Sequence, residues 1–238
     1  MQLDNSSKVF SKVSWFDQID STNLELMRQL DAEGVEFAAV LAGSQTAGQG
    51  RLGRQWQSPS GSSLSLSIST TRLGTSPGWL TLLAALAVNK MLANNGISAG
   101  IKWPNDVLVN GKKICGILAT MTRGFAIIGI GVNLRGQSED LNAVSLAELG
   151  VELDADSAAA QIGAELKELF AKYEANATAT RVEYANASIT LGQRVRAELP
   201  GGKEIVGVAS EIAPGGELVI LTPEPQVVGA GDVWHLRS

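Results

Sequence analysis

The sequence predicts an α+β fold in two parts, a larger domain over residues 1–186 and a small all-β domain over residues 187–238. Up to about residue 186, segments with the apolar spacing of helices are interspersed with short apolar runs typical of strands. After about Ala187 the helical period is absent, and short strand-like runs are separated by Pro-Gly-Gly turns at 200–202 and 214–216. With 238 residues, 45% of them hydrophobic, the chain can bury one sizeable core and a smaller second one.

Three segments have helical spacing. The first is expected from about Asn23 to Glu33, with Thr22 and Glu25 forming a capping box at its start. The second is expected to begin at Ser76-Pro77, because proline is favoured in the first turn of a helix. Its apolar residues lie on one face of the helix. The third is expected over residues 157–174.

The strands of the larger domain are predicted from apolar runs and from alternation. The segment 64–68 alternates leucine or isoleucine with serine, which predicts a strand with one buried face. Asn110-Gly111 predicts a tight hairpin between the two strands that flank it. The expected strands are 13–19, 37–43, 64–68, 97–103, 106–109, 113–122 and 125–133.

Composition excludes several classes of function. The net charge of −5 and a pI near 5.0 argue against a protein that binds nucleic-acid phosphate over a wide surface. The N-terminal residues lack the apolar region of a signal peptide, and no run is long enough to span a bilayer, so we expect no membrane association. The single cysteine, Cys115, indicates a reducing compartment, and we expect the cytoplasm. With one histidine, His235, a multi-histidine metal site is excluded, so the chemistry is expected to use lysine, arginine, carboxylates and backbone amides.

The segment from Ser44 to Gly61 is rich in glycine, has no apolar period and is expected to be a loop. Residues 48–53 read G-x-G-x-x-G, but a dinucleotide-binding site needs a helix directly after this pattern and an acidic residue about twenty positions on. The following residues RQWQSPSG do not form a helix, and position 70 is a threonine. A P-loop is excluded too, because no Lys-Ser or Lys-Thr follows the glycines.

Two interpretations of this glycine loop are left. The ordinary one is a flexible surface loop. The other is a nucleotide site, because Arg51 and Arg54 lie among glycines and next to Trp56. Glycines allow close approach of the backbone, arginines neutralise phosphate or carboxylate oxygens, and tryptophan offers a flat face for stacking.

A second cluster, Lys102-Trp103-Pro104-Asn105-Asp106, lies where one expected strand ends and a hairpin begins. Its ordinary interpretation is a turn with a solvated lysine. The functional interpretation places Lys102 at the strand end, with Ile101 and Trp103 pointing away from it, so that its ammonium faces a crevice.

Together these segments resemble the biotin protein ligases. The resemblance is carried by STN at 21–23, SQTAGQGRLGRQW at 44–56, KWPNDVLVNGKKICGIL at 102–118 and GIGVN at 129–133, and it spans essentially the whole chain. It implies a mixed sheet flanked by helices, related to class II aminoacyl-tRNA synthetases and lipoate ligases, followed by a small C-terminal SH3-like β-barrel. It also implies an activity in which ATP activates biotin as biotinyl-5′-AMP, and the biotinyl group is then attached to a lysine of the biotin carboxyl carrier domain of a biotin-dependent carboxylase.

The resemblance assigns roles to thirteen residues. Lys102 and Arg51 are implied to be catalytic. Contacts to biotin are implied for Ser21, Thr22, Asn23, Gln45, Gln49, Gly50, Arg51, Lys102, Gly116 and Leu118. Contacts to ATP or the adenylate are implied for Arg51, Arg54, Trp56, Lys102 and Asn133. Mg²⁺ is implied as a companion of ATP with ligands unassigned; Asp106 is one candidate, and capping of the hairpin is an equal alternative for it.

The chain departs from the family pattern at Gln49, where an arginine is usual, and at Leu52, which is often polar. Two alternative functions stay open at this point: a lipoate or octanoate ligase on the same fold, and a non-catalytic, biotin-sensing regulator. About a dozen residues precede the first expected strand, so we expect neither an N-terminal DNA-binding domain nor DNA binding. A monomer and a weak homodimer are both compatible with the sequence.

Overall fold

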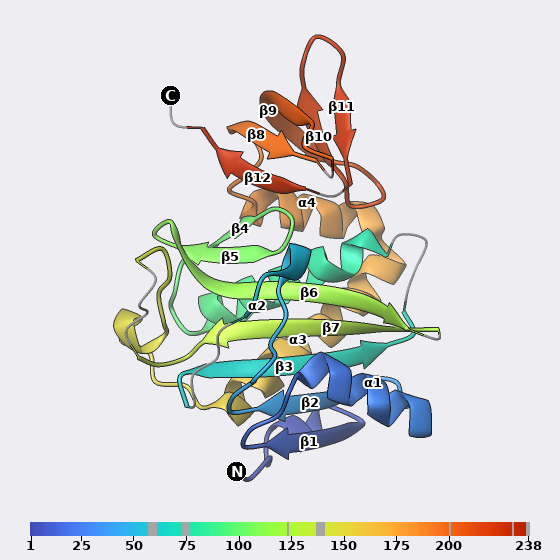
Figure 1. The fold of residues 1–238 in the computed structure, drawn as a ribbon, viewed down its shortest axis with the longest axis vertical. Coiled ribbons are helices and arrows are strands. Elements are labelled where there is room, and N and C mark those ends of the chain that lie inside the picture. The colour runs from blue at the N-terminus through green and yellow to red at the C-terminus, as the bar shows by residue number, and fades with distance from the viewer. Residues whose placement is uncertain are drawn as a thin grey trace.

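A seven-stranded mixed sheet lies at the centre of the computed structural model (Figure 1), which describes residues 1–56, 61–72, 77–122, 124–136, 141–199, 201–229 and 231–236. The strand order is β1-β2-β3-β7-β6-β5-β4, with β1 and β2 parallel and every other neighbouring pair antiparallel. The strands are β1 Lys12–Phe16, β2 Ala38–Ala42, β3 Ser63–Thr70, β4 Gly100–Lys102, β5 Asp106–Val109, β6 Lys112–Thr122 and β7 Phe125–Asn133. This confirms the expected α+β class and the mixed sheet.

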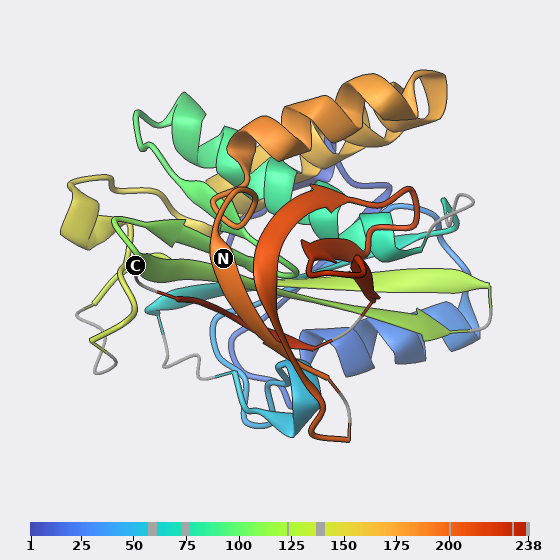
Figure 2. The same cartoon turned by 90° about the horizontal axis from the view of Figure 1, so that it is seen from above.

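Helices cover both faces of the sheet (Figure 2). On one face lie α2 (Gly78–Asn94), α3 (Ala155–Ala175) and α4 (Ala177–Ala187), and on the other lies α1 (Thr22–Ala32). Short 3₁₀ turns occur at Ser6–Lys8, Arg51–Gly53 and Ala147–Leu149. Within the described ranges, no helix is long and apolar enough to cross a membrane.

Alternation along β2 shows how one strand serves both faces. Ala39 and Leu41 belong to the main core under α2 and α3, whereas Ala38 and Val40 pack with Leu26 of α1 in a second, smaller cluster. Side chains of a strand point alternately to its two faces, and here both faces are covered, so all five residues of β2 are buried. The continuous apolar run at 37–43 predicted such a strand.

Two local predictions were wrong. All eight residues of β3 are buried, including its serines, so the predicted half-buried strand is buried on both sides. The capping box is absent: Ser21 is the N-cap residue and makes no side-chain capping bond, and the Thr22 N–H donates to the amide oxygen of Gln45 rather than to Glu25. Helix α4 had not been predicted, and it is weakly amphipathic, with Thr180 and Tyr184 as its buried residues. Ser76 and Pro200, predicted at a helix start and a turn, and residues 57–60 of the glycine loop lie outside the described residues.

The C-terminal residues form a separate five-stranded antiparallel sheet, strongly curved in Figure 2. Its order is β11-β10-β9-β8-β12, with β8 Arg194–Glu198, β9 Glu204–Ile212, β10 Leu218–Leu221, β11 Gln226–Val228 and β12 Asp232–His235. Two buried tryptophans join it to the larger domain, since the indole N–H of Trp79 donates to the Pro214 carbonyl and that of Trp103 donates to the Gly216 carbonyl, both over 3.0 Å. The small domain therefore packs directly on α2 and on the turn after β4.

The N-terminal segment is held to α3 by one buried carboxylate. Asp156 accepts from the Asn5 N–H over 2.8 Å, from the Ser6 N–H over 2.9 Å and from the Ser6 hydroxyl. Burial raises the pKa of Asp156, but the hydrogen bonds from Ser6 and Asn5 lower it more, so the net shift is downward from 3.8. The charged form is therefore the one that stabilises this contact.

Replacing Asp156 by asparagine is expected to lower the free energy of unfolding at pH 7 by about 1.5–3 kcal/mol, the usual contribution of a hydrogen bond to a charged group. Because the folded-state pKa is lowered, this contribution is present above about pH 4 and is lost as the pH falls through the folded pKa. Urea unfolding at pH 7 and at acidic pH measures it, with the exposed Asp4→Asn as the matched control. An equal stability of Asp156→Asn and Asp4→Asn at pH 7 would contradict the assignment.

Candidate active site

A pocket of about 330 Å³ opens between α1, the glycine loop, the sheet and the start of β12. Twelve of the thirteen residues singled out in the sequence line it: Ser21, Thr22, Asn23, Gln45, Gln49, Gly50, Arg51, Arg54, Trp56, Lys102, Gly116 and Leu118. They come from segments far apart in the chain. The structure therefore brings the separate motifs of the sequence to one place.

The floor of the pocket is a row of residues paired directly across five strands. Ser65, Gly131, Gly116, Asp106 and Lys102 follow one another across β3, β7, β6, β5 and β4. Residues opposite one another in neighbouring strands place their side chains on the same face of the sheet. Lys102 thus faces the pocket as a consequence of register, at the strand end where the sequence had placed it.

Glycines keep this floor flat. A Cβ atom at Gly131 would lie 2.3 Å from the indole of Trp56, and one at Gly129 would lie 2.5 Å from the amide oxygen of Asn23. At Gly116 a Cβ would lie 3.1 Å from the same indole. The Trp56 ring consequently rests on the backbone of β6 and β7, with the Lys113 ammonium 5.7 Å from its centre. Side chains at these three positions would displace groups that form the pocket.

The start of α1 forms one wall, and side chains from β3 and from the loop after β2 hold it in place. Gln45 Oε1 accepts from the Thr22 N–H over 2.8 Å and from the Thr22 hydroxyl over 3.1 Å. The Ser67 hydroxyl lies 2.8 Å from the Thr22 hydroxyl and 2.6 Å from Asn23 Oδ1. These contacts explain why Ser67 is buried, and they bring polar side chains to one end of the pocket.

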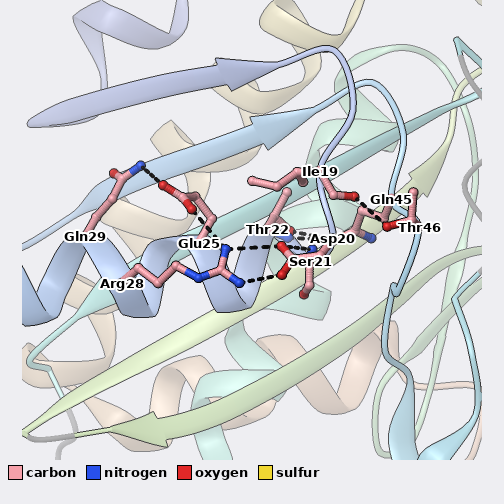
Figure 3. A network of polar contacts seen from close by, with 9 residues as sticks. All are labelled: Ile19, Asp20, Ser21, Thr22, Glu25, Arg28, Gln29, Gln45 and Thr46. Atoms are coloured by element: carbon pink, nitrogen blue, oxygen red, sulfur yellow. Dashed lines mark hydrogen bonds and ion pairs between the residues drawn. The ribbon is translucent and has the colours of Figure 1, made fainter.

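A second network braces the outer side of this wall (Figure 3). The Arg28 guanidinium bonds to both carboxylate oxygens of Asp20 and to Glu25, and the Asp20 carboxylate also accepts from the Ser21 N–H over 2.7 Å. The hydrogen bond from Arg28 holds the pKa of Asp20 below its usual value. Backbone bonds from Thr46 to Ile19 and from Ala47 to Asp20 tie the loop after β2 to the same segment. Ser21 and Gln45 are thereby held at a fixed separation.

The glycine loop is a short hairpin. The Trp56 N–H donates to the Gly48 carbonyl over 2.9 Å, and the Gly50 N–H donates to the Arg54 carbonyl over 2.7 Å. At its tip Leu52 and Gly53 have φ values of 55° and 73°, a left-handed conformation that costs little for glycine and more for leucine. The side chain of Leu52 is exposed, so the departure from the family pattern at this position lies outside the pocket.

The Lys102–Asp106 cluster links the pocket to its surroundings residue by residue. Trp103 is buried against the C-terminal domain through its bond to Gly216. Asn105 donates to the Ile117 carbonyl over 3.1 Å, which leaves its amide oxygen to accept from Arg51 Nη1 over 3.2 Å. Asp106 pairs with Lys113 over 2.7 Å. The cluster is a turn, as the ordinary interpretation had it, and it also positions pocket groups.

Positive charge dominates the pocket. Its lining holds four cationic side chains, Arg51, Arg54, Lys102 and Lys113, and two carboxylates, Asp106 and Asp232. Each carboxylate pairs with one cation, Asp106 with Lys113 and Asp232 with Arg54.

Within the described part of the chain the Lys102 ammonium makes no hydrogen bond or ion pair. Burial lowers the pKa of Lys102 below 10.5; the Asp106 carboxylate opposes this shift, while Lys113 and Arg54 add to it. Burial also lowers the pKa of Arg51. The arrangement suits an anionic ligand.

Asn133 is the one residue of the thirteen that does not line the pocket. Its amide donates to the carbonyls of Lys113 and Val144, over 3.3 and 3.1 Å, at the end of β7.

Several residues that line the pocket had been given no role from the sequence, among them Ser65, Lys113, Gly129, Gly131 and Asp232. The alternate glycines of 129–133 were the available signal for two of them. No group of three metal-ligating side chains (His, Cys, Asp, Glu) occurs among the described residues.

The comparisons with known proteins agree with this geometry. Residues 15–135 match the model of the Biotin/lipoate A/B protein ligase family, and residues 190–236 match that of the Biotin protein ligase C terminal domain. The biotin--[acetyl-CoA-carboxylase] ligase of Mycobacterium tuberculosis is 36% identical over an alignment that covers 99% of this chain and 93% of that protein. The chain belongs to the biotin protein ligase family.

Two further family members match most of this chain. The bifunctional ligase/repressor BirA of Escherichia coli is 31% identical, over 92% of this chain and 70% of that protein. The biotin protein ligase of Aquifex aeolicus, solved in complex with biotin and ATP, superposes with a TM-score of 0.82 at 26% identity and covers 96% of this chain and 100% of its own.

Proposed function

We propose that this biotin protein ligase joins biotin to ATP as biotinyl-5′-AMP and then transfers the biotinyl group to a lysine of a biotin carboxyl carrier domain. One observation carries the proposal: the pocket, in which the Trp56 ring packs on the glycines of β6 and β7, has two arginines in its lining and a partly desolvated lysine that has no hydrogen-bond or ion-pair partner among the described residues. A flat slot suits the fused rings of biotin, and the cations suit its carboxylate and the phosphates of ATP.

The roles of individual residues are part of the proposal. Ser21, Thr22, Asn23 and Gln45 would bind the ring system at the polar end of the slot, while Gly116 and Leu118 line its apolar side. Gln49, Gly50 and Arg51 would close over biotin and the adenylate. Trp56 would stack on adenine. Asn133 would read the adenine edge only if its bonds to Lys113 and Val144 rearrange.

The first step follows from charge. The biotin carboxylate attacks the α-phosphorus of ATP, a new O–P bond forms and pyrophosphate leaves. Both partners are anions, so their repulsion is the first obstacle. Among the described residues no carboxylate forms an ion pair with Lys102 or Arg51, so these two cations would neutralise the two reacting groups. Fixed cations in a site shielded from water act most strongly on a developing charge.

In the second step a neutral amine of the acceptor lysine attacks the acyl carbon of the mixed anhydride. The amide bond forms, AMP leaves as the anion, and the amine gives up a proton. The glycine hairpin covers the pocket between these steps and would limit attack by water.

Mg²⁺ is proposed as a companion of the ATP phosphates. A protein cage for the ion does not fit the lining, because Asp106 and Asp232 both already pair with cations. Mg²⁺ in nucleotide sites is commonly bound through one or two carboxylates, phosphates and water, so the ion would enter mainly on ATP.

Biotin-dependent release of pyrophosphate from ATP is the direct test, followed by transfer of biotin to a purified carrier domain. Lipoate and octanoate in competition with biotin address the alternative ligases, and a protein that only senses biotin would bind it without releasing pyrophosphate. Release driven by lipoate but not by biotin, or no release with either, would refute the proposal.

A further inference from the structure

The glycine hairpin is attached at its tip to two residues of the C-terminal domain: Asp232, the first residue of β12, and Gly231, which directly precedes it. Arg51 Nη2 donates to the Gly231 carbonyl over 3.2 Å, and the Arg54 guanidinium forms an ion pair with the Asp232 carboxylate. The two bonds join residues 178 and 180 positions apart in the chain, and Asp232, Val233 and Trp234 all line the pocket. The C-terminal domain thus supplies the support on which the hairpin rests.

The position of this support is fixed from behind. Asp232 pairs with Glu198 across β12 and β8, and a Cβ atom at Gly231 would lie 2.5 Å from the Glu198 carbonyl. Gly231 and the first residue of β12 therefore pack closely on β8, and the Asp232 carboxylate is presented to the hairpin from a strand of the sheet.

The ion pair leaves Arg54 able to serve a ligand at the same time. A guanidinium has five N–H donors, and Asp232 is bonded through Nη2. The Arg54 side chain remains 62% exposed, while that of Asp232 is 20% exposed. Arg54 can therefore keep Asp232 on one side and bind a phosphate oxygen on the other. Asp232, which touches no reacting atom in this arrangement, would act through Arg54.

We infer that Asp232 is a positioning residue that holds the glycine hairpin closed over the pocket and so retains the adenylate between the two steps. The inference rests on the proposed function. It assigns the C-terminal domain a specific part in the reaction: the domain anchors the hairpin through one carboxylate and one carbonyl. Removing the whole domain cannot test this, because it would expose the buried indoles of Trp79 and Trp103.

Asp232→Asn tests the inference with little change of shape. The dissociation rate of biotinyl-adenylate is measured after desalting the enzyme–adenylate complex. It is expected to rise about threefold to fivefold, the change that the loss of one partly exposed ion pair produces. The rate of pyrophosphate release in the first turnover should stay within about twofold of wild type, and the melting temperature should be unchanged. Glu198→Gln, an exposed acid paired across the strand from Asp232, is the matched control and should behave as wild type.

A double-mutant cycle separates an effect through the Arg54–Asp232 ion pair from a general effect on the C-terminal domain. If Asp232 acts through Arg54, Asp232→Asn should not raise the adenylate dissociation rate of Arg54→Gln any further, because the ion pair is already broken. The inference would be overturned if the effects of the two substitutions on the dissociation rate were additive, or if Asp232→Asn and Glu198→Gln released the adenylate at the same rate. Those results would leave the proposed function standing, whereas a wild-type protein without biotin-dependent pyrophosphate release would remove both.

Discussion

Lys102→Ala is expected to lower biotin-dependent pyrophosphate release by on the order of a hundredfold to a thousandfold, the usual loss when one preorganised charge-stabilising donor is removed. Lys102 is the pocket cation that has no hydrogen-bond or ion-pair partner among the described residues, and it has been partly desolvated. A charge held in this way has no structural bond to lose. The melting temperature of the variant should therefore stay close to that of wild type.

The controls for Lys102 separate charge at this atom from charge nearby. Lys112→Ala removes an exposed lysine from the adjacent hairpin and should leave the rate unchanged. Lys102→Arg keeps the charge in another shape and should recover part of the activity. A Lys102→Ala variant that makes adenylate at nearly the wild-type rate would show that the ammonium is not catalytic.

The pH dependence of the wild-type enzyme tests the role of the Lys102 charge independently. Burial lowers the pKa of Lys102, and the proposed step needs the charged form, so kcat/KM for biotin should fall as the pH rises toward a value below 10.5. In Lys102→Arg the guanidinium stays charged over this range, so that alkaline fall should disappear.

Local patterns carried most of the prediction from sequence. The predicted turn Asn110-Gly111 is found with φ values of 51° and 77°, and the strand predicted at 125–133 is β7 residue for residue. These elements are specified by neighbours in the chain, through turn chemistry and apolar runs. The same holds for Lys102, because a strand end and the alternation of side chains are enough to say which way it points.

The features that were missed depend on contacts between segments that lie far apart in the chain. The serines of β3 follow the alternating pattern of an exposed face, yet α1 and the pocket cover that face, and Ser67 is buried against Thr22 and Asn23. Nothing in the local sequence shows what covers a strand. Asp232 is a similar case, because its importance arises only when β12 meets the glycine hairpin.

The capping of α1 was missed for a related reason. Thr22 and Glu25 have the spacing of a capping box, but Glu25 bonds to Arg28 and Gln29, and Gln45 from a distant loop accepts from the Thr22 N–H. A long-range acceptor therefore replaced the local one. The Thr22 hydroxyl is likewise bonded to distant residues, Gln45 and Ser67, at the wall of the pocket.

Arg51→Gly is expected to release free biotinyl-adenylate and so to label bystander proteins. In the structure Arg51 joins the hairpin to Asn105 and to Gly231, over 3.2 Å in each case. Hydrogen bonds to a charged group contribute about 1.5–3 kcal/mol each. Holding one residue in one conformation costs about 1–2 kcal/mol, so the two bonds together offset the ordering of about three residues at the tip of the hairpin. Glycine at this position would add to the ordering cost. The hairpin should then stay open for much of the time.

The measurement is to incubate Arg51→Gly with biotin, ATP and serum albumin and to blot for biotin. Labelling of albumin should exceed that of wild type by about tenfold or more, since 1.4 kcal/mol corresponds to a factor of about ten. Arg51→Lys keeps the charge but can bridge Asn105 and Gly231 less well, so it should release biotinyl-adenylate and label albumin to an intermediate extent. Asp232→Asn, which loses one exposed ion pair, should leak less than Arg51→Gly. An Arg51→Gly enzyme that still forms adenylate and labels albumin no more than wild type does would show that Arg51 is not what holds the hairpin shut.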